Sequence, residues 1–94
     1  MTVGYSTSLR GTVLKAPKTL GNQLGRWAIH LDFSVSRISK ATGASRQTVY
    51  NWITGGEITQ AYRERVNELL LILRASNTAE IAWKKAKHRF NLKY

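Results

Sequence analysis

Cysteine is absent from this chain of 94 residues, and only five of its side chains are acidic. Without cysteine the chain has no disulfide bond, no zinc finger of the Cys2His2 kind and no thiol nucleophile. Its two histidines, His30 and His88, lie far apart in the sequence and have no carboxylate at ligand spacing. We therefore expect no metal site and no cofactor.

Long apolar runs are also missing. The longest, Leu69–Leu73, is far too short to cross a bilayer, and residues 1–18 lack the apolar stretch of a signal peptide. No pair of acids, no serine with a histidine and no glycine-rich phosphate loop suggests catalysis. These absences predict a soluble, intracellular protein that is not an enzyme.

Basic side chains are plentiful by contrast. Fifteen Lys and Arg against five Asp and Glu give a net charge of +10. Residues 1–56 carry seven basic groups and one acid, residues 57–83 carry three and four, and residues 84–94 carry five and none. So strong a positive field favours polyanions, of which nucleic acid is the partner we expect, rather than a membrane.

A chain of this length builds one small domain, which we divide into residues 1–18, 19–76 and 77–94. The first part is a basic arm or extension without a helical period, either short strands at "TVGY" and "GTVL" or a flexible end. The second part is the main body, and the third is a C-terminal helix with a basic tail. We predict an all-α fold, a compact bundle of about five helices that follows this extension.

Apolar residues recur at helical spacing from Thr19 onward. The predicted helices cover about 19–32, 34–42, 45–52, 59–74 and 77–90, and "NTAE" resembles a capping box that begins the last one at Asn77. Two glycines, Gly21 and Gly25, weaken the first helix by roughly 1 kcal/mol each relative to alanine. Either close packing or a ragged helix start accounts for them.

The third predicted helix has two different sides. Val49 and Trp52 share the face that belongs to the core, whereas the opposite side is polar and free of acids. Such a helix fits the major groove of B-DNA, where Arg46 can pair with guanine and Gln47 with adenine. The alternative is an ordinary solvated helix face.

The segment "VSRISKATGASRQTVYNW" resembles the helix-turn-helix of the lambda-repressor-like family, which includes phage repressor and Cro proteins. Its apolar, small, turn and ending positions match Ile38, Ser39, Gly43, Val49, Trp52 and Gly55. The resemblance spans roughly Leu20–Leu73 and implies a helix-turn-helix formed by the second and third of five helices. It differs at Val35, where the family often has a phosphate-binding glutamine, and in "TGGE", which lacks the family's basic residues.

The residues and the resemblance together name the expected DNA contacts. The base-reading candidates are Ser45, Arg46, Gln47 and Tyr50. The phosphate candidates are Ser34, Ser36, Arg37, Thr48, Asn51 and Thr54. Cations at the two ends of the chain are either auxiliary phosphate contacts or solubilising charges; these are Arg10, Lys15, Lys18, Lys84, Lys85, Lys87 and Arg89.

The resemblance implies a sequence-specific binder of double-stranded DNA, a transcriptional repressor or regulator of phage or mobile-element type. It would act in the cytoplasm of a bacterial or phage-infected cell, at the nucleoid, as a homodimer on palindromic sites. Two alternatives stay open. One is an adaptor of the same fold that binds a host polymerase or nuclease, and the other is a factor that positions DNA for recombination or packaging.

Overall fold

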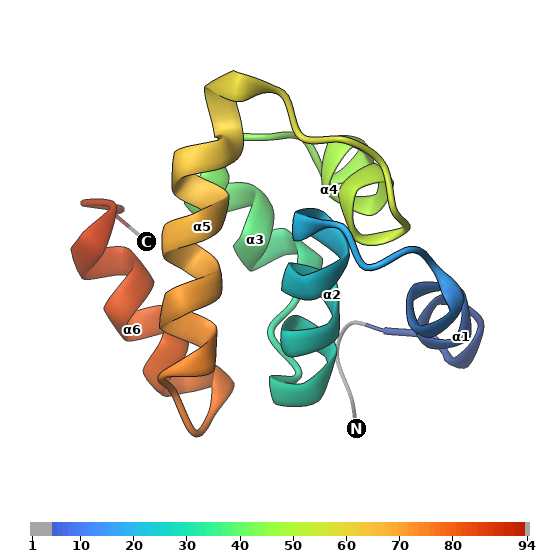
Figure 1. The fold of residues 1–94 in the computed structure, drawn as a ribbon. Helices are drawn as coiled ribbons and strands as arrows, with labels where there is room; N and C mark the ends of the chain where they lie inside the picture. The colour runs from blue at the N-terminus through green and yellow to red at the C-terminus, as the bar shows by residue number, and fades with distance from the viewer. Residues whose placement is uncertain (1–4, 94) are drawn as a thin grey trace.

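The computed structural model describes residues 5–93, and the regular structure within that range is entirely α-helical. The all-α class is therefore confirmed, with six helices in this range instead of about five. In chain order they are α1 Thr7–Lys15, α2 Leu20–Leu31, α3 Val35–Thr42, α4 Arg46–Ile53, α5 Gln60–Arg74 and α6 Ala79–Arg89 (Figure 1).

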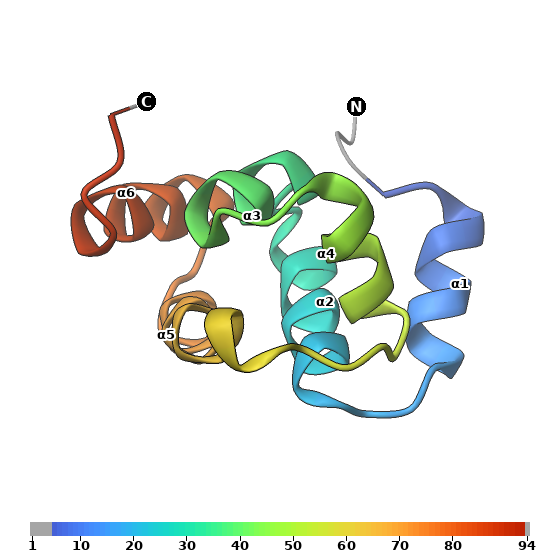
Figure 2. The ribbon, with the colours of Figure 1, turned by 90° about the horizontal axis from the view of Figure 1, so that it is seen from above.

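Helix α2 lies near the centre of the bundle and packs against α1, α4 and α5. Helix α6 packs on α5 and α3. Figure 2 shows α1 and α6 on opposite flanks of the molecule, with α3 and α5 between α4 and α6. No helix in residues 5–93 has both the length and the apolar character that a bilayer span requires.

The extension is the part of the fold that the sequence predicted wrongly. "GTVL" belongs to α1, which begins after the N-cap Ser6, whose hydroxyl accepts a hydrogen bond from the Leu9 N–H. Val13 is fully buried in the core, and this packing overrides the β-propensity of its neighbours. Of "TVGY", only Tyr5 lies within the described residues.

The two glycines of α2 mark close packing, not a ragged start. A Cβ at Gly21 would lie 2.7 Å from the Cβ and the carbonyl oxygen of Trp52. One at Gly25 would lie 2.5 Å from the Cβ of Ile53. Helices α2 and α4 therefore approach each other more closely than any larger side chain at these positions allows.

The caps of α3 and α4 follow the predicted pattern. Ser34 and Ser45 are N-caps that accept hydrogen bonds from the N–H groups of Arg37 and Thr48. Gly43 ends α3 with φ of 83°, the left-handed conformation that glycine adopts without strain. Only residues 43–45 separate the two helices, so α4 leaves α3 through a very short turn.

Helices α5 and α6 form an antiparallel pair, and their boundaries correct one prediction. The N-cap of α6 is Thr78, not Asn77, because its hydroxyl accepts from the Ile81 N–H. Glu80 consequently lies in the first turn of the helix, where it pairs with Arg37 instead of closing a capping box. Trp83 docks α6 on the core, with its ring centroid 6.1 Å from that of Phe33.

The aliphatic run of α5 is mostly core. Leu69, Leu70 and Leu73 are buried, whereas Leu71 is 62% exposed. Trp27 of α2 is partly buried and meets His30 edge to face, with the ring centroids 5.5 Å apart.

A buried tyrosine ties the start of the chain to the body. The Tyr5 hydroxyl donates to the Phe33 carbonyl at 2.6 Å, and the residue is 5% exposed. Burial, followed by the nearby Tyr50 and Asp32, raises the pKa of the Tyr5 phenol above its usual value of 10.0. The protonated phenol is thus the form that the folded state favours.

Tyr5→Phe is expected to lower the free energy of unfolding by about 1–2 kcal/mol, because the Phe33 carbonyl loses a buried donor. The Tyr5 contribution is complete below pH 10.0 and is lost as the pH rises above it, since the folded-state pKa is the higher one. Denaturant unfolding of the wild-type and Tyr5→Phe proteins below and above pH 10.0 measures this contribution to the free energy of unfolding. Tyr62→Phe, at a partly exposed tyrosine of α5, is the control, and an equal effect there would contradict the prediction.

Candidate nucleic-acid interface

Helix α4 presents one side to the core and one to solvent. Val49, Trp52 and Ile53 are at most 2% exposed. The outward side is polar, with Tyr50 at 36% exposure. Its exposed residues are Ser45, Arg46, Gln47, Tyr50 and Asn51. All four expected base-reading residues therefore come together on one accessible helix.

Hydroxyl groups organise the first turn of α4. Ser45 Oγ accepts from the Thr48 N–H at 3.2 Å and shares a hydrogen bond of 2.9 Å with Thr48 Oγ1. The exposed hydroxyl of Ser45 and the partly exposed one of Thr48 therefore lie side by side. These two hydroxyls form a small polar surface at the N-terminus of α4, the positive end of the helix dipole, where anion binding is favoured.

The C-terminal end of α4 is followed by a tight turn that folds back on the helix. Thr54 Oγ1 donates to the Tyr50 carbonyl at 2.8 Å, so this expected phosphate contact is already engaged within the helix. Gly55 has φ of 104°, and the Gly56 N–H donates to the Asn51 carbonyl at 2.8 Å. A Cβ at Gly56 would lie 2.7 Å from that carbonyl oxygen, so the turn folds tightly against Asn51.

Sequence reasoning missed the residue that holds α4 in place. Asn22 is fully buried, and its Nδ2 donates to the carbonyls of Val13 and Ile53, each at 2.8 Å. Its Oδ1 accepts from Arg26 Nε at 2.8 Å, and Arg26 Nη2 donates to the Leu14 carbonyl at 2.7 Å.

These carbonyls belong to the last turns of α1 and α4, where backbone carbonyls lack the regular hydrogen bond of a helix interior. The Val13 carbonyl also accepts from the Ala16 N–H at 3.3 Å. Asn22 and Arg26 of α2 thus join the C-terminal ends of both helices. A helical wheel could have indicated Asn22, because it places this polar residue beside the buried Gly25.

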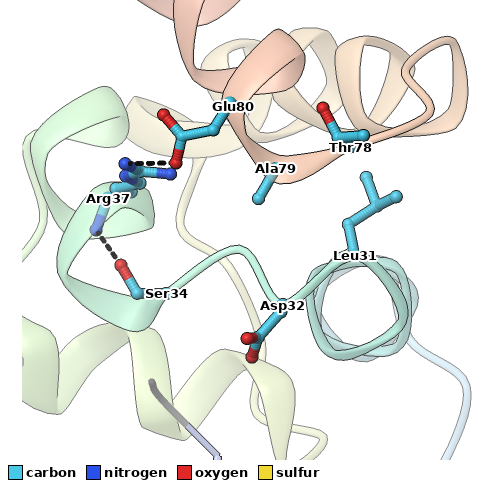
Figure 3. Close-up of a pocket in the computed structure, with 7 residues that line it drawn as sticks. All are labelled: Leu31, Asp32, Ser34, Arg37, Thr78, Ala79 and Glu80. Atoms are coloured by element: carbon cyan, nitrogen blue, oxygen red, sulfur yellow. Dashed lines mark hydrogen bonds and ion pairs between the residues drawn. The ribbon is translucent and has the colours of Figure 1, made fainter. Parts of the chain in front are cut away.

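Helices α3 and α4 and the turn between them contain no acidic residue. The only acid in residues 5–56 is Asp32, and no acid occurs between Phe33 and Gly56. Asp32 ends α2 in the left-handed conformation with φ of 62°, and its Oδ1 is buried with no hydrogen-bond partner among the described residues. Figure 3 shows its carboxylate pointing away from α6.

The phosphate candidates at the start of α3 differ in where their side chains point. Ser34 and Ser36 are partly exposed near the start of the helix, and Val35 is buried at 4% exposure. The Arg37 guanidinium turns toward α6, where Nη2 lies 3.0 Å from Glu80 Oε2 and the group stacks 5.4 Å from the Trp83 ring centroid (Figure 3). The structure therefore does not place Arg37 with the outward face of α4.

The contact between α3 and α6 borders a pocket of about 350 Å³. Its lining residues are Leu31, Asp32, Ser34, Arg37, Thr78, Ala79 and Glu80 (Figure 3). The Ser34 and Thr78 hydroxyls both act as helix caps, and Arg37 pairs with Glu80. Within residues 5–93, no three His, Asp or Glu side chains gather where they could hold a metal ion.

The auxiliary cations divide between the two flanks. Lys15 and Lys18 are exposed at and just after the end of α1, and Arg10 Nε donates to the Tyr5 carbonyl at 3.3 Å. On α6, Lys84 and Lys85 are exposed. Lys87 lies 5.8 Å from the Trp83 ring centroid, and Arg89 pairs with Glu68. The two groups flank the body from opposite sides (Figure 2).

In comparisons with known proteins, no protein-family model, curated protein or solved structure matches this chain. Its function must therefore be inferred from the geometry of the site.

Proposed function

We propose that this protein binds double-stranded DNA through α3 and α4, which act as a helix-turn-helix and place α4 in the major groove. The observation that carries the proposal is the outward face of α4, which is exposed, polar and free of acids. The helix is anchored by Val49, Trp52 and Ile53 and by the Asn22 hydrogen bond at its C-terminal end. A rigid polar helix of this kind can align its side chains with base edges.

Each polar group has a chemical counterpart in DNA. Arg46 can donate two hydrogen bonds to a guanine, Gln47 can pair with adenine, and Tyr50 can reach a base edge or a thymine methyl group. The hydroxyls of Ser45 and Thr48, with the start of α3 at Ser34 and Ser36, suit phosphate oxygens. The net charge of +10 adds long-range attraction to the duplex.

The biological role that we propose is a transcriptional regulator of phage or mobile-element type, active at the bacterial nucleoid. The resemblance of "VSRISKATGASRQTVYNW" to the lambda-repressor-like family supports this role. One short helix reads only a few base pairs, so useful specificity requires two copies on a palindrome or on sites one helical turn apart.

Selection of bound sequences from a random duplex pool tests the proposal, and we expect a short palindromic site. Arg46→Ala and Gln47→Ala should each weaken binding to that site by about 1–3 kcal/mol and relax the preference at one base position. Lys84→Ala is the matched control. A Lys84 side chain that contacts phosphate contributes to binding of every sequence. Its removal should therefore weaken binding to all sequences alike and reduce the slope of log affinity against log salt by about 0.9.

Two other outcomes would reject parts of the proposal. Weak binding that hardly responds to salt would exclude DNA as the ligand. Steep salt dependence without any sequence preference would exclude a regulator and favour a DNA-positioning role in recombination or packaging.

A further inference from the structure

Two large aliphatic side chains remain in solvent on the helices that form the α5–α6 pair. Leu71 of α5 is 62% exposed, and Ile81 of α6 is 42% exposed. A groove of about 380 Å³ lies between the two helices, lined by Glu68, Leu71, Ile72, Lys85 and Arg89. Ile81 precedes Lys85 by one turn of helix, on the same side of α6. The floor of this groove is aliphatic, and none of its lining residues is aromatic.

The edge of the groove is basic. Its single acid, Glu68, is paired with Arg89. Lys85 reaches back across the turn, where its Nζ donates to the Ala75 carbonyl at 3.1 Å. Lys84 and His88 continue the exposed surface of α6, whose only acid, Glu80, pairs with Arg37. The α6 side of the groove therefore presents uncompensated positive charge beside an apolar floor.

We propose that this α5–α6 groove binds an acidic amphipathic segment of a partner protein. Aliphatic side chains of that segment would cover Leu71 and Ile72, and its carboxylates would face Lys85 and the neighbouring cations of α6. An amphipathic helix in an apolar groove is a common recognition mode, and complementary charge sets its orientation.

The same features disfavour the other occupants. Nucleic acid gains little from an aliphatic floor without aromatic rings, because bases bind by stacking on such rings. A second copy of the chain would bring two like-charged groove edges together in a protein of net charge +10. Helices α3 and α5 lie between α6 and α4 (Figures 1 and 2), and no residue of α4 lines the groove. The proposal therefore goes beyond DNA binding and does not depend on it.

A labelled synthetic peptide helix with leucine on one face and glutamate on the other is a suitable probe. Fluorescence anisotropy should show binding that weakens with salt. Leu71→Gln and Lys85→Glu should each raise the Kd about tenfold or more. The matched controls are Leu14→Gln, at a leucine that is 57% exposed on α1, and Lys15→Glu, both on the opposite flank. All four positions are exposed, and circular dichroism confirms that the variants fold.

Three results would overturn this proposal. The first is no peptide binding, or equal loss in Leu71→Gln and Leu14→Gln. The second is a dimer that Leu71→Gln converts to monomers in sedimentation, which would make a second copy the occupant. The third is a loss of duplex DNA binding in Lys85→Glu with peptide binding unchanged. Arg46→Ala should leave peptide binding intact, so failure of the DNA proposal is seen separately.

Discussion

Gly21→Ala is expected to lower the free energy of unfolding by about 2 kcal/mol, although alanine is the better helix former. The added methyl group would collide with the backbone of Trp52, with its carbonyl oxygen at 2.7 Å and its carbonyl carbon at 2.9 Å. Backbone atoms within a hydrogen-bonded helix cannot move aside cheaply, so α4 must shift as a unit. Denaturant unfolding gives the stability, and DNA binding by the folded fraction reports the shift of α4.

Gly11→Ala is the matched control for this effect. A Cβ at Gly11, inside α1, would meet nothing within 4 Å. The substitution should therefore stabilise the protein by up to about 1 kcal/mol. Gly25→Ala, which would place its Cβ 2.5 Å from that of Ile53, should behave like Gly21→Ala. Similar effects at Gly11 and Gly21 would show that α2 and α4 are not in close contact.

Asn22→Ala is expected to be the most damaging polar substitution, with a loss of about 3–4 kcal/mol. It leaves the buried Ile53 carbonyl without a donor and removes the acceptor of Arg26 Nε. The Val13 carbonyl loses its shorter hydrogen bond and keeps only the Ala16 N–H, at 3.3 Å. Each buried polar group left unpaired costs about 1–3 kcal/mol, a large share of the roughly 5–15 kcal/mol that stabilises a domain.

The comparison for Asn22 is Asn67→Ala, at an exposed position of α5. That change should alter stability by no more than about 0.5 kcal/mol. Thermal unfolding followed by circular dichroism measures both, and DNA selection with the folded Asn22→Ala protein shows whether α4 keeps its orientation. Equal stability of the two variants would mean that the buried amide does not hold the helices together.

Local chemistry explains what the sequence predicted well. Ser34, Gly43 and Ser45 carry cap and turn preferences that do not depend on distant contacts, so α3, α4 and the turn between them were predictable. The split of α4 into a core face and a polar face follows from the spacing of Val49 and Trp52.

The errors arose where a distant partner decides the structure. The apolar residues of α1 show only weak helical periodicity. The contacts of Val13 and Tyr5 are with distant parts of the chain, at Asn22 of α2 and at Phe33. The role of Asn22 depends on the Ile53 carbonyl, 31 residues away. The pairing of Arg37 with Glu80, 43 residues away, likewise could not be predicted from the local sequence pattern.

The attachment of α1 also has a consequence for local unfolding. Its links to the body, through Tyr5, Val13 and the two carbonyls that Asn22 and Arg26 engage, are few compared with the broad buried face of α5. Segments with few buried contacts open as separate cooperative units, well below the free energy of global unfolding. Opening of α1 withdraws one of the two carbonyls that Asn22 engages, so the end of α4 can loosen while the core remains folded.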